Sequence, residues 1–187
     1  MEQNFEILSR NHHSIIYAIS DTTVGKIFAS KLVWTDRSGK EIAPPFPDRN
    51  SIDEQVEALQ FANEINDLVV KLIEKSEYQG QEMLVMERLY PISAECFTAT
   101  EKGQLLANFE TKLEQLHENG FVHGDFIRPR MRVPACFENI ILTKDGFKLI
   151  DTDFSMVLNQ ANIRAFIYKK MDEEKEFELF KNYFLSV

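Results

Sequence analysis

The stretch that decides the fold is LEQLHENGFVHGDFIRPRMRVPACFENIILTKDGFKLID, residues 113–151. Its first residues belong to a predicted helix that Thr98 and Glu101 can cap and that Gly120 can terminate. Two short apolar segments, NIILT and FKLID, flank a turn at residues 144–146 and predict a β-hairpin. The stretch therefore predicts a long helix, a polar loop and a hairpin, in that order.

Three polar residues stand at the ends of these predicted elements. Asp125 follows the helix, Asn139 precedes the first hairpin strand, and Asp151 ends the second. If the three meet in one cleft, they suit phosphoryl transfer from a magnesium nucleotide. One carboxylate can orient the attacking hydroxyl, while the amide and the other carboxylate supply the oxygen ligands that Mg²⁺ prefers. Taken alone, His-Gly-Asp is weak support, because Asp after a helix is most often a turn residue.

The first half of the chain predicts a sheet with one helix. Ser51 and Glu54 have the spacing of a capping box and predict a helix that runs to about Asn66. Residues 35–50 hold three of the six prolines and predict a loop. The predicted strands, rich in β-branched and aromatic residues, are residues 5–9, 14–20, 24–29, 68–74 and 82–89.

Composition and charge narrow the class of protein. The 187 residues carry a formal net charge of −9, which argues against a nucleic-acid backbone as the main partner. No run of about 18 apolar residues predicts a membrane span, and the first ten residues do not resemble a secretion signal. Two cysteines, Cys96 and Cys136, are too few for a disulfide framework. These features favour a soluble, cytoplasmic protein.

The stretch around His-Gly-Asp resembles the catalytic core of the protein kinase-like superfamily, in which H-R-D-x-x-x-x-N is followed by D-F-G at a strand end. The His-Gly-Asp form is similar to that of aminoglycoside phosphotransferases and of compact atypical kinases, such as the RIO type and lipopolysaccharide-core kinases. Three upstream segments, VGKIF, VEALQFANEINDLVVKL and EMLVMERL, follow in the order of the family. The resemblance covers roughly residues 5–155.

The resemblance implies an α+β fold of the bilobal protein kinase-like type. Residues 1–89 would form an N-lobe with a five-stranded antiparallel sheet, and residues 90–187 a reduced, mainly helical C-lobe of the same domain. Only residues 152–187 follow Asp151, which leaves no room for a large activation segment or a helical platform that docks peptides.

The resemblance also implies a site for ATP in the first half of the chain. Lys26 would anchor the phosphates and pair with Glu57, although the nearby Glu54 and Glu64 leave the choice of glutamate open. Met86 would be the gatekeeper before the hinge. Residues 87–89 would face the adenine, with Glu87 and Leu89 at the ends of that segment.

The catalytic residues would come from the second half of the chain. Asp125 would position the acceptor hydroxyl, and Asn139 and Asp151 would hold Mg²⁺. Asp153 is the second choice for the metal aspartate, because Asp153-Phe154-Ser155 keeps the D-F-x letters, whereas the strand position favours Asp151.

The sequence departs from the family pattern in three places. Residues 8–18 replace the Gly-rich loop but contain no glycine, so the approach of backbone amides to phosphates is expected to differ. Gly124 stands where the family has arginine. Asp125 and Asn139 are 14 positions apart instead of 5, with an insert at residues 127–137. Arginines 128, 130 and 132 of this insert are expected to be solvated or to contact phosphate or an acidic substrate.

The sequence leaves three interpretations open, two kinase-like functions and one unrelated function. The first is a small atypical kinase, an ATP-dependent phosphotransferase that uses ATP and Mg²⁺ and acts on a hydroxyl of a protein or a small molecule. The second is a catalytically weak or inactive kinase-like module that binds nucleotide or a partner protein. The third is an α+β binding protein in which the motifs are coincidental.

Overall fold

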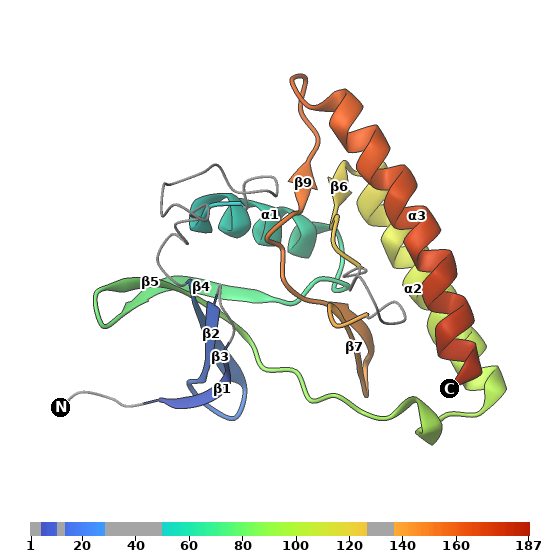
Figure 1. The fold of residues 1–187 in the computed structure, drawn as a ribbon, viewed down its shortest axis with the longest axis horizontal. Helices are drawn as coiled ribbons and strands as arrows, with labels where there is room; N and C mark the ends of the chain where they lie inside the picture. The colour runs from blue at the N-terminus through green and yellow to red at the C-terminus, as the bar shows by residue number, and fades with distance from the viewer. Residues whose placement is uncertain (1–4, 11–13, 29–49, 127–136) are drawn as a thin grey trace, which may run out of the picture.

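The computed structural model describes residues 5–10, 14–28, 50–126 and 137–187 (Figure 1). Within these residues the chain has an α+β fold with a five-stranded antiparallel sheet and three α-helices. Almost all of the predicted loop at residues 35–50 and of the insert at residues 127–137 lies outside the described residues. No helix in this part of the chain is both long enough and apolar enough to cross a bilayer.

The five-stranded sheet confirms the five predicted strands, with boundaries that shift by one or two residues except at the fourth strand, where both ends shift by four. Its strands are β1 (Glu6–Arg10), β2 (Ser14–Ala18), β3 (Thr23–Phe28), β4 (Leu72–Tyr78) and β5 (Gln81–Glu87), in the spatial order β1-β2-β3-β5-β4. β4 and β5 are joined by a tight turn at Gln79 and Gly80, both of which have positive φ angles. This turn explains the glycine at position 80.

The predicted strand at residues 68–74 starts before β4, which begins at Leu72, because residues 68–70 pair with a different partner. Val69 forms a parallel bridge with Leu149. The Val70 N–H donates to the Leu149 carbonyl, and the Leu149 N–H donates to the Leu68 carbonyl, both at 2.8 Å. Residues 68–70 therefore lie beside the C-terminal hairpin, and the chain joins the five-stranded sheet from Leu72 onward. This pairing fixes the end of that hairpin beneath the sheet.

The first helix begins and ends close to its predicted bounds. α1 (Ile52–Ile65) starts at a capping box in which Ser51 and Glu54 bond each other's backbone N–H groups. Its inner face buries Gln55 and three apolar side chains, Ala58, Leu59 and Ala62. α1 contacts β4 and β5 of the sheet and also β6 and β9 of the second half.

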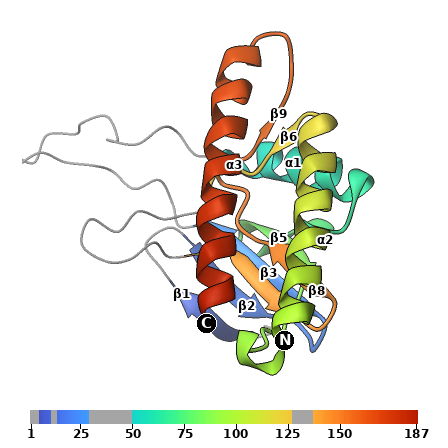
Figure 2. The same cartoon turned by 90° about the vertical axis from the view of Figure 1, so that its right-hand side faces the viewer.

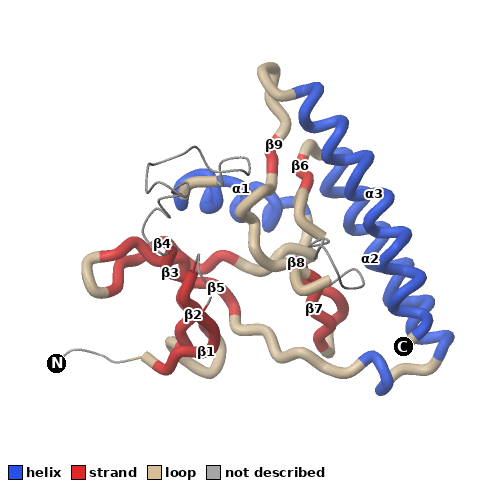
Figure 3. The backbone as a smooth tube through the Cα atoms, viewed as in Figure 1, coloured by secondary structure: helices blue, strands red, loops and turns tan. Residues whose placement is uncertain are grey.

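The second half supplies two long helices and the predicted hairpin. α2 (Ala99–Glu118) begins at the predicted Thr98–Glu101 capping box, and Gly120 follows it with a φ of +89°. The hairpin of β7 (Ile140–Thr143) and β8 (Gly146–Leu149) lies between the sheet and the helices (Figure 3). The remaining elements are the 3₁₀ turn η1 (Ala94–Cys96), the paired strands β6 (Phe121–Val122) and β9 (Met156–Val157), and α3 (Ile163–Ser186).

α2 and α3 pack side by side in opposite directions along one flank of the molecule (Figure 2). Near the end of α2, His117 contacts Glu173 of α3. Near its start, the Lys102 ammonium donates to the backbone of Val187, the last residue. The last thirty residues contain a single α-helix, α3.

One hydrophobic cluster runs from the sheet through α1 and the hairpin to α2 and α3. Phe109 of α2 lies at its centre, with 1% of its surface exposed. The expected apolar stripe of α3, Phe177, Phe180 and Phe184, is buried against it. The aromatic rings within 6.1 Å of the Phe109 ring, between centroids, are those of Phe126, Phe147, Phe177 and Phe180.

We expect Phe109→Ala to lower the free energy of unfolding by about 3–5 kcal/mol, because it removes a fully buried ring and leaves a cavity among its neighbours. Tyr168→Ala on α3, which is 69% exposed, is the control and should change it by less than about 0.5 kcal/mol. Urea denaturation followed by circular dichroism measures both. An equal effect of the two substitutions would contradict this description of the core.

Candidate functional site

A cavity of about 550 Å³ lies between the five-stranded sheet and the β7–β8 hairpin. Six of the nine residues predicted to form the site line it: Lys26, Met86, Glu87, Leu89, Asn139 and Asp151. A volume of this size is within the usual range for pockets that bind small molecules and cofactors. The cavity therefore collects residues that are more than 100 positions apart in the sequence.

The cavity wall is largely aliphatic, and its polar and charged residues include Lys26, Asn139 and Asp151 as well as Glu87, Arg88 and Glu138. The aliphatic lining comes from both sides of the cavity: Ile16, Val24, Leu84 and Met86 from the sheet, Leu59 from α1, and Ile141 and Ile150 from the hairpin and its end. Such a combination suits a ligand with a flat apolar part and a charged part.

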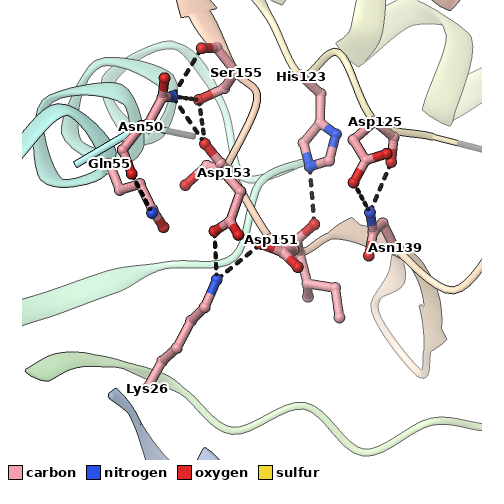
Figure 4. A network of polar contacts seen from close by, with 11 residues as sticks. Lys26, Asn50, Gln55, His123, Asp125, Asn139, Asp151, Asp153 and Ser155 are labelled. Atoms are coloured by element: carbon pink, nitrogen blue, oxygen red, sulfur yellow. Dashed lines mark hydrogen bonds and ion pairs between the residues drawn. The ribbon is translucent and has the colours of Figure 1, made fainter. Parts of the chain in front are cut away.

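Lys26 joins the sheet to the segment that follows β8. Its ammonium lies 2.8 Å from an Oδ1 atom of Asp151 and 2.8 Å from an Oδ1 atom of Asp153 (Figure 4). The side chain is only 7% exposed. Because a buried ammonium without a partner would be strongly destabilising, these two carboxylates are what allow a lysine at this position of β3.

The cluster of Lys26, Asp151 and Asp153 has a net negative charge when both aspartates are ionised. Burial is the largest effect on Asp153 and raises its pKa to about 6, with the Lys26 cation acting in the opposite direction and Asp151 adding to the rise. One lysine thus neutralises only part of two neighbouring carboxylates. A cation added to this group would compensate the remaining charge.

Asp151, not Asp153, faces the cavity. Asp151 lines the cavity, and its side chain is 18% exposed, against 3% for Asp153. Its backbone has a φ of +68°, a left-handed conformation that is uncommon for residues other than glycine. Of the two aspartates, Asp151 is therefore the one that a ligand in the cavity would meet, and its role as the metal aspartate stays a prediction.

Asn50, immediately before α1, holds the segment after β8 in place. Its side-chain Nδ2 donates to the Thr152 carbonyl at 3.0 Å and to the Ser155 carbonyl at 2.9 Å. Its backbone N–H donates to the Asp153 carbonyl at 2.8 Å. Gln55 in turn donates to the Asn50 carbonyl (Figure 4). The sequence analysis missed this role, since an Asn before a capping serine carries no distinctive signal.

Asp125 and Asn139 are in contact despite the long insert between them. Asn139 Nδ2 donates to the Asp125 backbone carbonyl at 2.7 Å and to its Oδ2 atom at 3.0 Å (Figure 4). The 14-residue separation is therefore compatible with the expected pairing of the two residues. Since both bonds use Nδ2, the Oδ1 atom of Asn139 is the one left to accept a hydrogen bond or to ligate a cation.

His123 has a structural role. It is fully buried, and its Nε2 donates to the Ile150 carbonyl at 2.9 Å. Among the described residues its Nδ1 has no hydrogen-bond partner. The bond ties the loop before Asp125 to the residue before Asp151, so that both carboxylates are held relative to one scaffold.

Glu57 is not brought to Lys26. The Glu57 side chain is exposed on α1, while Lys26 bonds Asp151 and Asp153. The polar residue of α1 that lines the cavity is Gln55, two positions earlier, which the sequence pattern did not indicate. The expected Lys26–Glu57 pair is therefore wrong for this structure, because the helical face toward the cavity presents an amide at position 55.

The segment in place of the Gly-rich loop contributes side chains to the cavity. Leu8 and Ser9 of β1 and Ser14 of β2 line it. Position 11 and the three insert arginines lie outside the described residues. No cluster of three or more His, Cys, Asp or Glu side chains forms a metal cage in the described ranges. Asn139 and Asp151 could supply two oxygen ligands, a number that is common for Mg²⁺ that also binds phosphate.

Comparisons with known proteins identify no relatives. No protein-family model matches the chain, and a search of curated proteins finds no match.

We expect the free energy of unfolding of Asp153→Asn, relative to the unmodified protein, to increase by roughly 1–3 kcal/mol between pH 4 and pH 7.5. Because the pKa of Asp153 is raised from 3.8 to about 6, the folded protein holds this proton more tightly than the unfolded chain. Its stabilising contribution is complete below pH 3.8 and is lost as the pH rises through 6. Asparagine cannot ionise and removes this loss.

Urea titrations at several pH values measure this difference. The control is Asp172→Asn on the exposed side of α3, for which the difference should stay within about 0.5 kcal/mol across the same range. A pH-independent difference for Asp153→Asn would contradict the proposed protonation of the buried carboxyl.

Proposed function

We propose that this chain is a small atypical kinase that binds Mg-ATP and transfers the γ-phosphate to a hydroxyl of a protein or a small molecule. The proposal includes a bilobal protein kinase-like fold, with the five-stranded sheet as the N-lobe and α2, α3 and the hairpin in the reduced C-lobe. One observation carries it: Lys26 of the sheet and Asn139 and Asp151 of the hairpin line the same cavity as residues 86–89.

The aliphatic part of the cavity suits the adenine. Val24 and Met86 are cross-strand partners on β3 and β5, and both line the cavity with Ile150 on the opposite side. These side chains can hold a flat ring between two apolar surfaces. Glu87 and Leu89, in the segment that leaves β5, line the same space and would face the edge of the ring.

The polar part of the cavity suits a polyphosphate with a divalent cation. Lys26 would bind phosphate oxygens by exchanging one of its carboxylate contacts for them. Asn139, through Oδ1, and Asp151 would hold the magnesium ion, and the excess negative charge around Lys26 favours a cation there. When bound, Mg²⁺ supplies charge neutralisation and orientation of the phosphates.

Asp125 would position the acceptor hydroxyl and accept its proton. The carboxylate is half-buried and is held by the Asn139 amide, so its orientation is fixed relative to the residues that would bind the metal. Most of the rate enhancement would then come from positioning and electrostatic stabilisation. Because residues 152–187 are largely taken up by α3, the chain offers little surface for an extended peptide acceptor.

A second candidate is a kinase-like module that binds nucleotide or a partner protein with little or no turnover. Two observations favour it: Glu57 is exposed on α1, and Lys26 bonds two aspartates in its place. The glycine-free segment at residues 8–18 adds to this case.

We expect ATP with Mg²⁺ to raise the midpoint of thermal unfolding, because a ligand that binds only the folded state stabilises it by about 2.7 kcal/mol at a concentration of 100 Kd. Lys26→Met should remove most of this shift, and Asp151→Asn should remove its dependence on Mg²⁺. Lys75→Met, an exposed lysine of β4, is the matched control and should keep the full shift.

Asp125→Asn separates the two candidates. In an active kinase it should retain the thermal shift and lose ATP turnover by a factor of about 100 or more, as measured by release or transfer of labelled phosphate. A nucleotide shift without turnover in the unmodified protein would favour the second candidate. If Mg-ATP has no effect on a folded protein, both candidates are wrong.

A further inference from the structure

α3 brings a buried acidic residue to the loop that contains Asp125. Glu173 is 1% exposed, although it is a glutamate in the middle of a surface helix. Its Oε2 atom accepts a hydrogen bond from the Gly124 N–H at 2.6 Å, and its Oε1 atom contacts His117 Nε2 of α2 at 3.0 Å. The neighbour of Asp125 is therefore fixed by a side chain about fifty residues further along the chain.

Lys169 lies one helical turn before Glu173 and contacts the other side of the site. Its ammonium donates to the Phe154 carbonyl, directly after Asp153. Since residues four positions apart share one face of a helix, Lys169 and Glu173 act from the same side of α3. One helix face thus contacts both the loop before Asp125 and the segment after Asp151.

The glycine at position 124 is explained by this arrangement. Its φ is +75°, and a Cβ atom placed there would lie 2.8 Å from the Phe154 carbonyl oxygen and 3.2 Å from the Lys169 Nζ atom. The space of a side chain at position 124 is taken by the end of Lys169. A cation from α3 therefore stands close to the place where the related motif has its arginine.

The charges around Lys169 support a functional contact. Burial is the largest effect and lowers the pKa of the Lys169 ammonium, while the carboxylates of Glu173 and Asp125 act in the opposite direction. Keeping a half-buried lysine at this point costs free energy that a methionine of similar length would not cost. This free-energy cost is explained if the positive charge of Lys169 contributes to the function of the site.

We propose that Lys169 and Glu173 are positioning residues of the phosphotransfer site: together they hold the Asp125 loop against the segment that follows Asp151, and Lys169 places a positive charge at Gly124, the residue before Asp125. This inference rests on the proposed kinase function. It makes the arrangement of the two aspartates depend on the C-terminal helix. The contacts of Lys169 and Glu173 form within the folded chain and do not require a covalent modification of a loop.

The test compares Lys169→Met and Glu173→Gln with Lys170→Met, a matched lysine on α3 that pairs only loosely with Glu174. Glutamine keeps the shape of Glu173 but removes its negative charge and replaces one acceptor oxygen by a donor NH2 group, so it cannot accept from both Gly124 and a His117 that donates. Two readouts are used. One is the rate of ATP turnover at several ATP concentrations, and the other is amide hydrogen exchange in peptides that cover residues 119–126, 152–157 and 72–87.

We expect Lys169→Met and Glu173→Gln to lower kcat by about 10- to 100-fold with less than a threefold change in KM for ATP, because the misplaced group is Asp125 rather than the nucleotide pocket. Exchange should become faster at residues 119–126 and 152–157 and stay unchanged at residues 72–87. Lys169→Arg should recover part of kcat, and Lys170→Met should behave like the unmodified protein.

Exchange and turnover separate failure of the inference from failure of the proposed function. An unmodified protein that neither binds Mg-ATP nor turns it over refutes the proposed function. In that case faster exchange at residues 119–126 in Lys169→Met still supports the positioning role, and unchanged exchange overturns it. Normal turnover in both variants, or a loss shared by Lys170→Met, also overturns the inference. Faster exchange in all three peptides would show general destabilisation and would equally count against it.

Discussion

The contact of the Lys26 ammonium with Asp151 and Asp153 is the constraint on which the rest of the site depends. A lysine with 7% of its side chain exposed must be paired, and its partners come from a segment 125 and 127 residues further along the chain. The sheet can bury Lys26 only if the end of β8 is held beneath it. The pairing of residues 68–70 with Leu149 and the bonds from Asn50 provide that hold.

The elements with strong local signals could be predicted from the sequence. The two capping boxes and the turn at residues 144–146 gave the starts of α1 and α2 and the β7–β8 hairpin, because capping and turn chemistry act within a few residues. The bounds of β4 could not be obtained in this way. Residues 68–74 form a mostly apolar segment that also contains Lys71 and Glu74, and only the distant Leu149 determines that its first part leaves the sheet.

The sequence could predict those cavity-lining residues that a motif specifies by residue type and position. Lys26, Asn139 and Asp151 line one cavity as the ordered motifs imply. The orientation of α1 was not predictable, because residues 55 and 57 differ by about half a turn, and tertiary packing decides which of them faces inward. Asn50 and Glu173 act through backbone groups of distant residues, so no pattern near them indicates their partners.

α3 keeps two charged residues away from solvent, the buried Glu173 and the half-buried Lys169, although burying a charge costs free energy. A helix that only covered a hydrophobic core would do so with apolar residues, as α3 does at Phe177 and Phe180. At Glu173 and Lys169 the same helix turns charged groups toward backbone atoms of the two loops that carry Asp125 and Asp153. Unpaired, each would destabilise the protein, and paired, each fixes a loop in one position. The segment that carries Asp153 is thus held by Lys26 and Asn50 from the N-terminal half of the chain and by Lys169 of α3. The loop that carries Asp125 is held by Asn139 and by Glu173 of α3. A site made of residues from both ends of the chain requires constraint from both directions.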